Sequence, residues 1–180
     1  VAAVIAHLAA GRCHIVGHSL GGVIAQDLLV RYGGSCAAAV LVSTSSKVGA
    51  QAAEGWRRPA DVGEQRGGVG EGGSARAFSE AFAADHPELV AEQGRISASA
   101  DAKVYAAQAR AASSYDYSEA LAAVDRPVLV MQGLADRMTS PGGSVLLSRA
   151  LPHGELELIE GVGHNLHVEM GERFVAAVLD

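Results

Sequence analysis

Short apolar runs of strand length recur along the chain and alternate with segments of helical pattern. The strand-like runs occupy residues 14–16, 38–42, 127–131 and 155–159. The helical patterns occupy residues 1–10, 21–32, 143–151 and 167 to the end. Apolar strands separated by helices are typical of a parallel sheet that is buried on both faces. The pattern therefore predicts an α/β fold, a mostly parallel sheet with flanking helices.

The pattern changes between residues 47 and 125, where alanine-rich helical segments replace the strands. Helices are predicted around residues 75–84, 87–93, 102–112 and 118–124. Residues 61–75 are rich in glycine, which favours a mobile stretch. We therefore expect two parts. Residues 1–46 and 126–180 form a partial α/β core, and residues 47–125 form a helical insertion packed over the sheet.

Composition and charge narrow the class of protein. The 180 residues are 49% hydrophobic and 4% aromatic, and the formal net charge is −6. Nucleic-acid binding is not expected, because it requires basic surfaces and aromatic stacking platforms. Cys13 and Cys36 are too few for a zinc site, so no metal and no cofactor are predicted. No run approaches the roughly 18 uninterrupted apolar residues of a membrane span, so we expect no membrane insertion and a cytoplasmic protein.

The hexapeptide GHSLGG, residues 17–22, connects the first strand-like run to the helical pattern that follows it. In Gly-x-Ser-x-Gly, a strand that turns abruptly into a helix strains the backbone of the serine, and the glycines leave room around the turn. This context favours a nucleophilic Ser19 over an ordinary glycine-rich bend. A phosphate- or nucleotide-binding loop is the competing interpretation, but the lysine of a P-loop and the acidic ribose contact of a dinucleotide site are missing from their places.

A nucleophilic serine needs a base that takes its proton and an acid that orients the base. Asp136 follows the third strand-like run, and His164 follows the fourth. The carboxyl ends of parallel strands meet at one edge of a sheet, where ligands bind. The sequence therefore predicts that Ser19, Asp136 and His164 lie together at that edge.

These motifs resemble the α/β-hydrolases, in particular the lid-bearing branch with a serine nucleophile that includes esterases and enol-lactonases. The resemblance rests on three segments in the chain order Ser, Asp, His, namely GHSLGG at 17–22, PVLVMQGLAD at 127–136 and GVGHNLHVE at 161–169. It implies that Ser19 is the nucleophile, that His164 is the general base and then acid, and that Asp136 orients the imidazole. It also implies that the Leu20 N–H is an oxyanion-hole donor and that the insertion is a lid.

Other residues are assigned on less information. Trp56 and Tyr105 in the insertion and His18 in the turn are candidate substrate contacts, although packing beside the turn also explains His18. His167 is expected to pack at the surface or at a helix end. Glu169 is expected to support the start of the last helix.

We therefore predict a serine hydrolase that cleaves an ester, lactone or related acyl bond of a small molecule through an acyl-enzyme. The alternative is a catalytically impaired fragment, or a relative that keeps the fold for binding. The resemblance covers the C-terminal part of the family's fold, so the strands and the second oxyanion donor that precede this part are expected to be missing. The strand near residues 13–16 would then be an exposed apolar edge, which a second copy of the chain could cover in a homo-oligomer.

Overall fold

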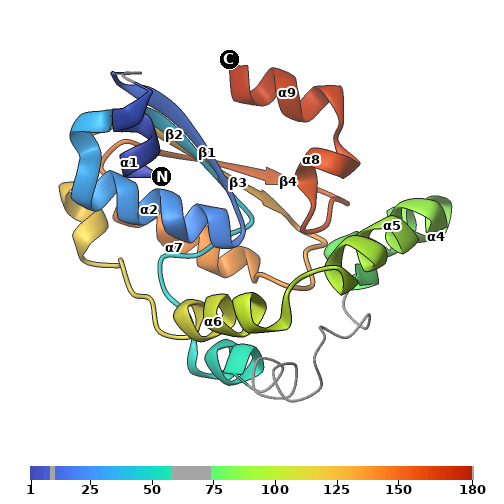
Figure 1. The fold of residues 1–180 in the computed structure, drawn as a ribbon. Helices are drawn as coiled ribbons and strands as arrows, with labels where there is room; N and C mark the ends of the chain where they lie inside the picture. The colour runs from blue at the N-terminus through green and yellow to red at the C-terminus, as the bar shows by residue number, and fades with distance from the viewer. Residues whose placement is uncertain (9–10, 58–73, 180) are drawn as a thin grey trace.

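A computed structural model describes residues 1–8, 11–57 and 74–179 (Figure 1). Within these residues, four strands form one sheet in the order β1-β2-β3-β4, and every neighbouring pair is parallel. The strands are β1 (Cys13–His18), β2 (Cys36–Val42), β3 (Val128–Gly133) and β4 (Gly154–Ile159). Each contains one of the four apolar runs, so the predicted α/β fold with a parallel sheet is confirmed.

Helices cover both faces of this sheet, as Figure 1 shows. α2 (Leu20–Tyr32) and α7 (Pro141–Ala150) pack on one face, where Leu28 and Leu41 belong to a buried cluster. The C-terminal helices pack on the other face, where Val42 and Leu166 are buried together. Successive strand residues point to opposite faces, so the neighbours Leu41 and Val42 contribute to different cores. Two short elements complete this part, α1 (Ala2–His7) before β1 and the 3-10 turn η1 (Gly33–Ser35) before β2.

The C-terminal segment forms two helices, and the single helix predicted from residue 167 onward is therefore wrong. α8 (Leu166–Glu169) ends before α9 (Glu172–Leu179) begins. Gly171 lies between them with φ +54°. Glycine adopts this left-handed conformation without a Cβ clash, which makes it a common end point of helices.

The segment between β2 and β3 is helical where it is described. Its elements are a helical stretch at residues 50–57, the 3-10 turns η2 (Ser74–Ala77) and η3 (Ala120–Ala123), and the helices α4 (Glu80–Asp85), α5 (Pro87–Ala98) and α6 (Ala102–Ala112). The helix predicted at 75–84 is thus divided in two, and the one predicted at 118–124 is a short 3-10 turn. Residues 61–73 of the glycine-rich stretch lie outside the described residues. The division of the chain into core and lid stays a prediction.

β1 lies at one edge of the sheet. Within the part of the chain that the structure describes, β2 is the only strand paired with it. Val16 in β1 is 51% exposed, so this edge carries accessible apolar surface. None of the helices in the described ranges has both the length and the apolar character needed to cross a membrane.

Candidate active site

Ser19 occupies the sharp turn between β1 and α2. Its φ of 54° and ψ of −117° are unusual for a residue with a side chain. Ser19 and Ser43 are the only described residues other than glycine with a positive φ. The Ser19 N–H donates to the carbonyl oxygen of Val42 at 2.9 Å, which connects the turn to the end of β2. Strained residues of this kind persist where the surrounding structure holds them, often at functional sites.

Close packing requires two of the three glycines around this turn. A Cβ at Gly17 would lie 2.5 Å from the carbonyl oxygen of Gly21, and a Cβ at Gly22 would lie 2.6 Å from Cγ2 of Thr44. A Cβ at Gly21 would meet no heavy atom within 4 Å. The expectation that both glycines of Gly-x-Ser-x-Gly make room for the turn is therefore wrong for Gly21, and Gly22 makes the second close approach.

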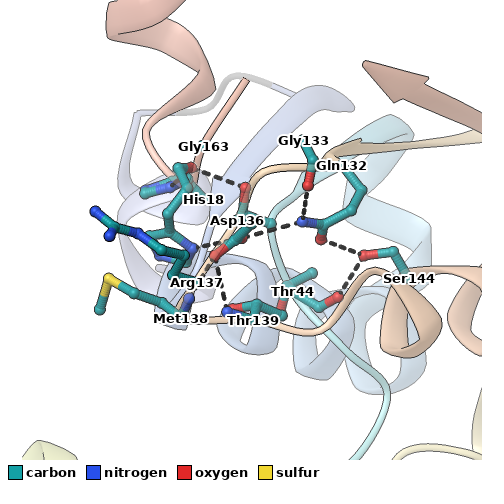
Figure 2. Close-up of polar contacts among 12 residues, drawn as sticks. His18, Thr44, Gln132, Gly133, Asp136, Arg137, Met138, Thr139, Ser144 and Gly163 are labelled. Carbon is teal, nitrogen blue, oxygen red and sulfur yellow. Dashed lines mark hydrogen bonds and ion pairs between the residues drawn. The ribbon is translucent and has the colours of Figure 1, made fainter. Parts of the chain in front are cut away.

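Asp136 lies in the loop after β3, and its side chain is fully buried. Oδ1 accepts hydrogen bonds from the main-chain N–H groups of Met138 at 2.7 Å and Thr139 at 2.9 Å. Oδ2 accepts one from Nε2 of Gln132 at 3.0 Å and lies 2.9 Å from Nδ1 of His164. Figure 2 shows Gln132, Met138 and Thr139 around the carboxylate. Every lone-pair direction of a buried carboxylate is thus used, which lowers the cost of its burial.

Two opposing effects act on the pKa of Asp136. Burial raises it, because the charged form loses solvation. The hydrogen bond and charge of His164, together with the N–H groups of Thr139 and Met138, lower it and outweigh the burial. The pKa of Asp136 consequently lies below the ordinary value of an aspartate, and the side chain is ionised at neutral pH.

His164 lies in the loop after β4 and is 4% exposed. Because an ionised carboxylate can only accept, the His164 Nδ1–H is the donor in the contact with Asp136. Nε2 is then the ring nitrogen that can accept a proton. If it does, the negative charge of Asp136 stabilises the imidazolium. Sequence reasoning placed these two residues at one sheet edge, and the structure brings them into direct contact.

A buried amide and a hydroxyl support the carboxylate, and sequence reasoning missed both. Oε1 of Gln132 accepts from Oγ of Ser144 at 2.8 Å, and the same Oγ lies 2.9 Å from the carbonyl oxygen of Thr44 (Figure 2). Gln132 and Ser144 are completely buried. The one sequence signal was a polar residue near the end of an otherwise apolar strand, which is too common to single out Gln132.

Glu169 also has a different place from the one predicted. It is the last residue of α8, and it does not support the start of a helix. Its Oε1 accepts from the N–H groups of Gly163 at 3.1 Å and Ser79 at 2.9 Å, and its Oε2 accepts from Oγ of Ser79 at 2.7 Å. The carboxylate therefore connects the loop that contains His164 to the segment just before α4.

A cavity of about 580 Å³ lies between Ser19 and the helical segment. Ser19 and Leu20 line it on one side, and Trp56, Tyr105 and Tyr115 line it on the other. Trp56 and Tyr105, the two predicted substrate contacts of the insertion, thus reach the same cavity as Ser19. Leu20 is the first residue of α2, and the first N–H groups of a helix have no acceptor within it. Sequence reasoning missed Tyr115, whose hydroxyl lies 2.8 Å from Oγ of Ser45.

For His18 the sequence left two roles open, a contact with substrate and packing beside the turn, and the structure places its ring beside the turn. It is not among the described residues that line the cavity. Its ring centroid lies 4.8 Å from that of His164 and 4.9 Å from that of His167. The geometry therefore matches packing beside the turn, and not a contact with substrate.

Three comparisons place the chain among known proteins. 3-Oxoadipate enol-lactonase 2 of Acinetobacter baylyi is 27% identical over 180 residues, which cover 99% of this chain and 66% of that protein. 3-Oxoadipate enol-lactonase 1 of the same organism is 25% identical over 166 residues, covering 91% of this chain and 61% of that protein. The structure of a thermophilic esterase from Thermogutta terrifontis, bound to malate, is similar with a TM-score of 0.88 and 26% identity, covering 98% of this chain and 66% of that one.

The chain thus spans less than two thirds of the length of each of these two enol-lactonases. A family model described as "Alpha/beta hydrolase family" matches residues 1–177. That match contains the turn at Ser19 and the loops of Asp136 and His164. The chain therefore belongs to the alpha/beta hydrolase family.

Proposed function

We propose that this chain carries the active site of a serine hydrolase, in which Ser19 attacks the carbonyl carbon of an ester or lactone and forms an acyl-enzyme. The observation that carries the proposal is the 2.9 Å contact between Nδ1 of His164 and Oδ2 of Asp136. This contact holds the imidazole in the tautomer whose Nε2 can take a proton. The strained turn that bears Ser19 lies at the same edge of the sheet.

Each residue has a defined task in the proposed reaction. Nε2 of His164 takes the proton of Ser19 Oγ as the Oγ–carbon bond forms, and gives it to the leaving oxygen as the acyl–oxygen bond breaks. A water molecule then attacks the acyl-enzyme, loses a proton to Nε2, and that proton returns to Ser19. Asp136 stays ionised throughout. The Leu20 N–H, at the positive end of the α2 dipole, donates to the oxyanion.

The size and the lining of the cavity favour small substrates with uncharged or apolar acyl groups. Its volume of about 580 Å³ is typical of small-molecule sites, which span roughly 300–1,000 Å³. Lys47 is the one charged residue among the described lining residues, so a positively charged substrate is disfavoured. The names of the similar proteins, enol-lactonase and esterase, both denote cleavage of acyl–oxygen bonds and support this class.

Labelling with a fluorophosphonate probe tests the proposal, because the probe reacts with a serine that a neighbouring base has activated. We expect peptide mass spectrometry to locate the adduct on Ser19, and Ser19→Ala to remain unlabelled. Ser45→Ala is the matched control, because Ser45 lines the same cavity without a strained backbone. An adduct on another serine that persists in Ser19→Ala would contradict the assignment. A folded wild-type protein that stays unlabelled would favour the non-catalytic alternative.

A panel of p-nitrophenyl esters and lactones of increasing acyl size tests the substrate class. We expect turnover of short apolar acyl groups and a decline once the acyl chain exceeds the cavity. Cationic acyl groups should be poor substrates of matched size. A preference for cationic substrates would contradict the reading of the cavity.

A further inference from the structure

The main chain of His164 is held from two directions. Its carbonyl oxygen lies 2.9 Å from Nε2 of His18 and 2.8 Å from Oγ of Ser43. A carbonyl oxygen only accepts, so both side chains are donors in these contacts. One carbonyl oxygen has two lone pairs, and both are used here by side chains that come from elsewhere in the fold.

The two donors belong to the strand ends that position Ser19. His18 is the last residue of β1 and directly precedes Ser19. Ser43 directly follows β2, is completely buried, and has a φ of 49° that is rare for a residue with a side chain. Its own N–H donates to the carbonyl oxygen of Met131 in β3 at 3.0 Å. The strained Ser43 is therefore anchored by its backbone while its hydroxyl reaches the base loop.

These contacts complement the hydrogen bond between His164 and Asp136. That bond constrains Nδ1 of the ring, but β3 and β4 supply both partners, and neither strand bears Ser19. The contacts from His18 and Ser43 span 146 and 121 positions of the chain and connect the base loop to β1 and β2. Within the described residues, they are the polar side-chain contacts that connect the main chain of the base to the elements of the nucleophile.

The protonation state of His18 allows it to act as a neutral hydrogen-bond donor beside His164, which becomes positively charged during the proposed reaction. Burial lowers the pKa of His18 to about 4, with the positive charge of protonated His164 and of protonated His167 contributing in the same direction. The bond to the His164 carbonyl and the charge of Asp136 oppose this shift without overcoming it. His18 therefore donates its Nε2–H without placing a second positive charge next to the imidazolium.

We propose that His18 and Ser43 are positioning residues that hold the main chain of His164, through its carbonyl oxygen, at the place from which Nε2 reaches Oγ of Ser19. This inference rests on the proposed serine hydrolase function and extends it to two residues that do not themselves react. A displacement of about 1 Å between reacting groups costs on the order of 10²-fold in rate. Two hydrogen bonds that fix the position of the His164 peptide group can therefore have a measurable effect on the reaction rate.

The test compares variants that keep or lose the donor at nearly constant polarity. His18→Gln retains an N–H at about the reach of Nε2, whereas the shorter His18→Asn does not. Ser43→Ala removes the hydroxyl without changing the β-carbon at the strained backbone. His167→Leu is the control, because the His167 ring packs on the ring of His18 and, among the described residues, does not hold the His164 carbonyl oxygen. Circular dichroism establishes that each variant is folded.

Two readouts separate positioning from stability and from the proposed function. The first readout is kinetic. It comprises the rate at which the fluorophosphonate probe labels Ser19 and the separate values of kcat and KM for ester turnover. We expect His18→Asn and Ser43→Ala each to lose about tenfold in labelling rate and in kcat with KM little changed, and the double variant to lose about 10²-fold. His18→Gln should recover most of the loss, and His167→Leu should label like the wild type.

The second readout is the low-field proton NMR signal of the His164 Nδ1–H that is bound to Asp136, which does not depend on activity. We expect it to broaden or move in His18→Asn and Ser43→Ala and to stay in His18→Gln. Folded variants that label at the wild-type rate and keep this signal overturn the positioning role. A wild type that shows the signal but is not labelled overturns the proposed function alone, and the response of the signal to the variants then decides the positioning role by itself.

Discussion

Single residues carry backbone strain at two places in the site, Ser19 and Ser43. Both follow the carboxyl end of a strand, and β1 and β2 are neighbours, so the two strained residues are held by adjacent parts of one sheet. The cost of each conformation is met by the contacts of the surrounding fold. Space at the turn is equally restricted, because a side chain at Gly17 would meet the backbone of Gly21.

The first prediction at this scale contrasts the two glycines of the pentapeptide. Gly17→Ala should be strongly destabilising, because its Cβ would lie 2.5 Å from a backbone oxygen that cannot move without distorting α2. Gly21→Ala should keep or raise stability by up to about 1 kcal/mol, because alanine is the better helix former and its Cβ has open space. Urea unfolding measures both. Equal losses in the two variants would show that the turn needs Gly21 as well.

The second prediction concerns the pH dependence of stability. The native pKa of Asp136 lies below its ordinary value, so the unfolded chain binds more protons in acid. The contribution of Asp136 to the free energy of unfolding is therefore complete above the unfolded pKa of about 3.9 and is lost as the pH falls through the lowered native pKa. We expect Asp136→Asn to be less stable than the wild type at neutral pH, with a difference that shrinks in acid.

Urea unfolding at a series of pH values measures this difference. Asp125→Asn is the control, because the Asp125 side chain is exposed and its carboxylate lies 3.2 Å from the ring of the exposed His153. A difference between wild type and Asp136→Asn that is independent of pH would contradict the prediction. Under the proposed function, Asp136→Asn should also lower kcat by about 10⁴-fold, the effect of the same change in a serine protease triad.

At the scale of elements, the helical segment is attached to the loops that bear the acid and the base. Besides the Glu169 bridge to Ser79, the N–H of Asn165 donates to the carbonyl oxygen of Ala77 at 2.8 Å. Arg137, next to Asp136, pairs with Glu80 at 2.9 Å. Elements that lie far apart in the sequence thus meet at the carboxyl end of the sheet, and their contacts restrict the loops that bear Asp136 and His164.

The third prediction tests the Glu169 bridge. Glu169→Ala leaves the N–H groups of Gly163 and Ser79 without their acceptor, and each buried donor without a partner costs about 1–3 kcal/mol. For the two donors together we expect a loss of about 2–6 kcal/mol in urea unfolding, and faster amide hydrogen exchange at Ser79 and Gly163. Glu172→Ala, an exposed glutamate in the first turn of α9, is the control. Unchanged exchange at Ser79 would mean that the bridge does not hold the segment.

At the scale of the whole molecule, the cavity is lined both by the turn at Ser19 and by residues of the segment between β2 and β3. Two alanines of α6 differ in their relation to this cavity. Both are buried and pack in one cluster with Trp56 and Tyr105, but of the two only Ala109 lines the cavity. Figure 1 shows α6 beside the helical stretch at residues 50–57. The same substitution therefore changes the packing at both positions, but it changes the cavity wall only at Ala109.

The fourth prediction uses this pair. Ala109→Leu should cost less stability than Ala106→Leu, because part of the added side chain can enter the cavity, and should lower kcat/KM for long acyl esters relative to acetyl esters by about tenfold. Ala106→Leu should destabilise the fold by about 1–3 kcal/mol, because it overpacks a filled site. Thermal unfolding and ester profiling measure the two effects. An unchanged acyl preference in Ala109→Leu would place the substrate elsewhere.

Local patterns in the sequence were sufficient to predict the strands and the strand ends at which the candidate site residues lie. The apolar runs identify β2 and β3 because these central strands have no exposed position, whereas β4 is recognised by glutamates that alternate with apolar residues. The parallel arrangement then brings the residues after β3 and β4 to one edge, which is why Asp136 and His164 were identifiable before their contact was seen. The break at Gly171 was equally local, since glycine is a helix-ending residue, but an apolar helical pattern on both sides obscured it.

Only the tertiary structure decided which residues support that site. The partners of His18, Ser43, Glu169 and Gln132 come from other elements, and the contact between His18 and His164 joins residues 146 positions apart. The roles of Gly21 and Gly22 likewise depended on the position of Thr44. Sequence determines the propensity and burial of a segment, because these depend on neighbours along the chain. Hydrogen-bond partners, close approaches and the walls of a cavity depend on neighbours in space, and a single sequence does not specify those before the chain has folded.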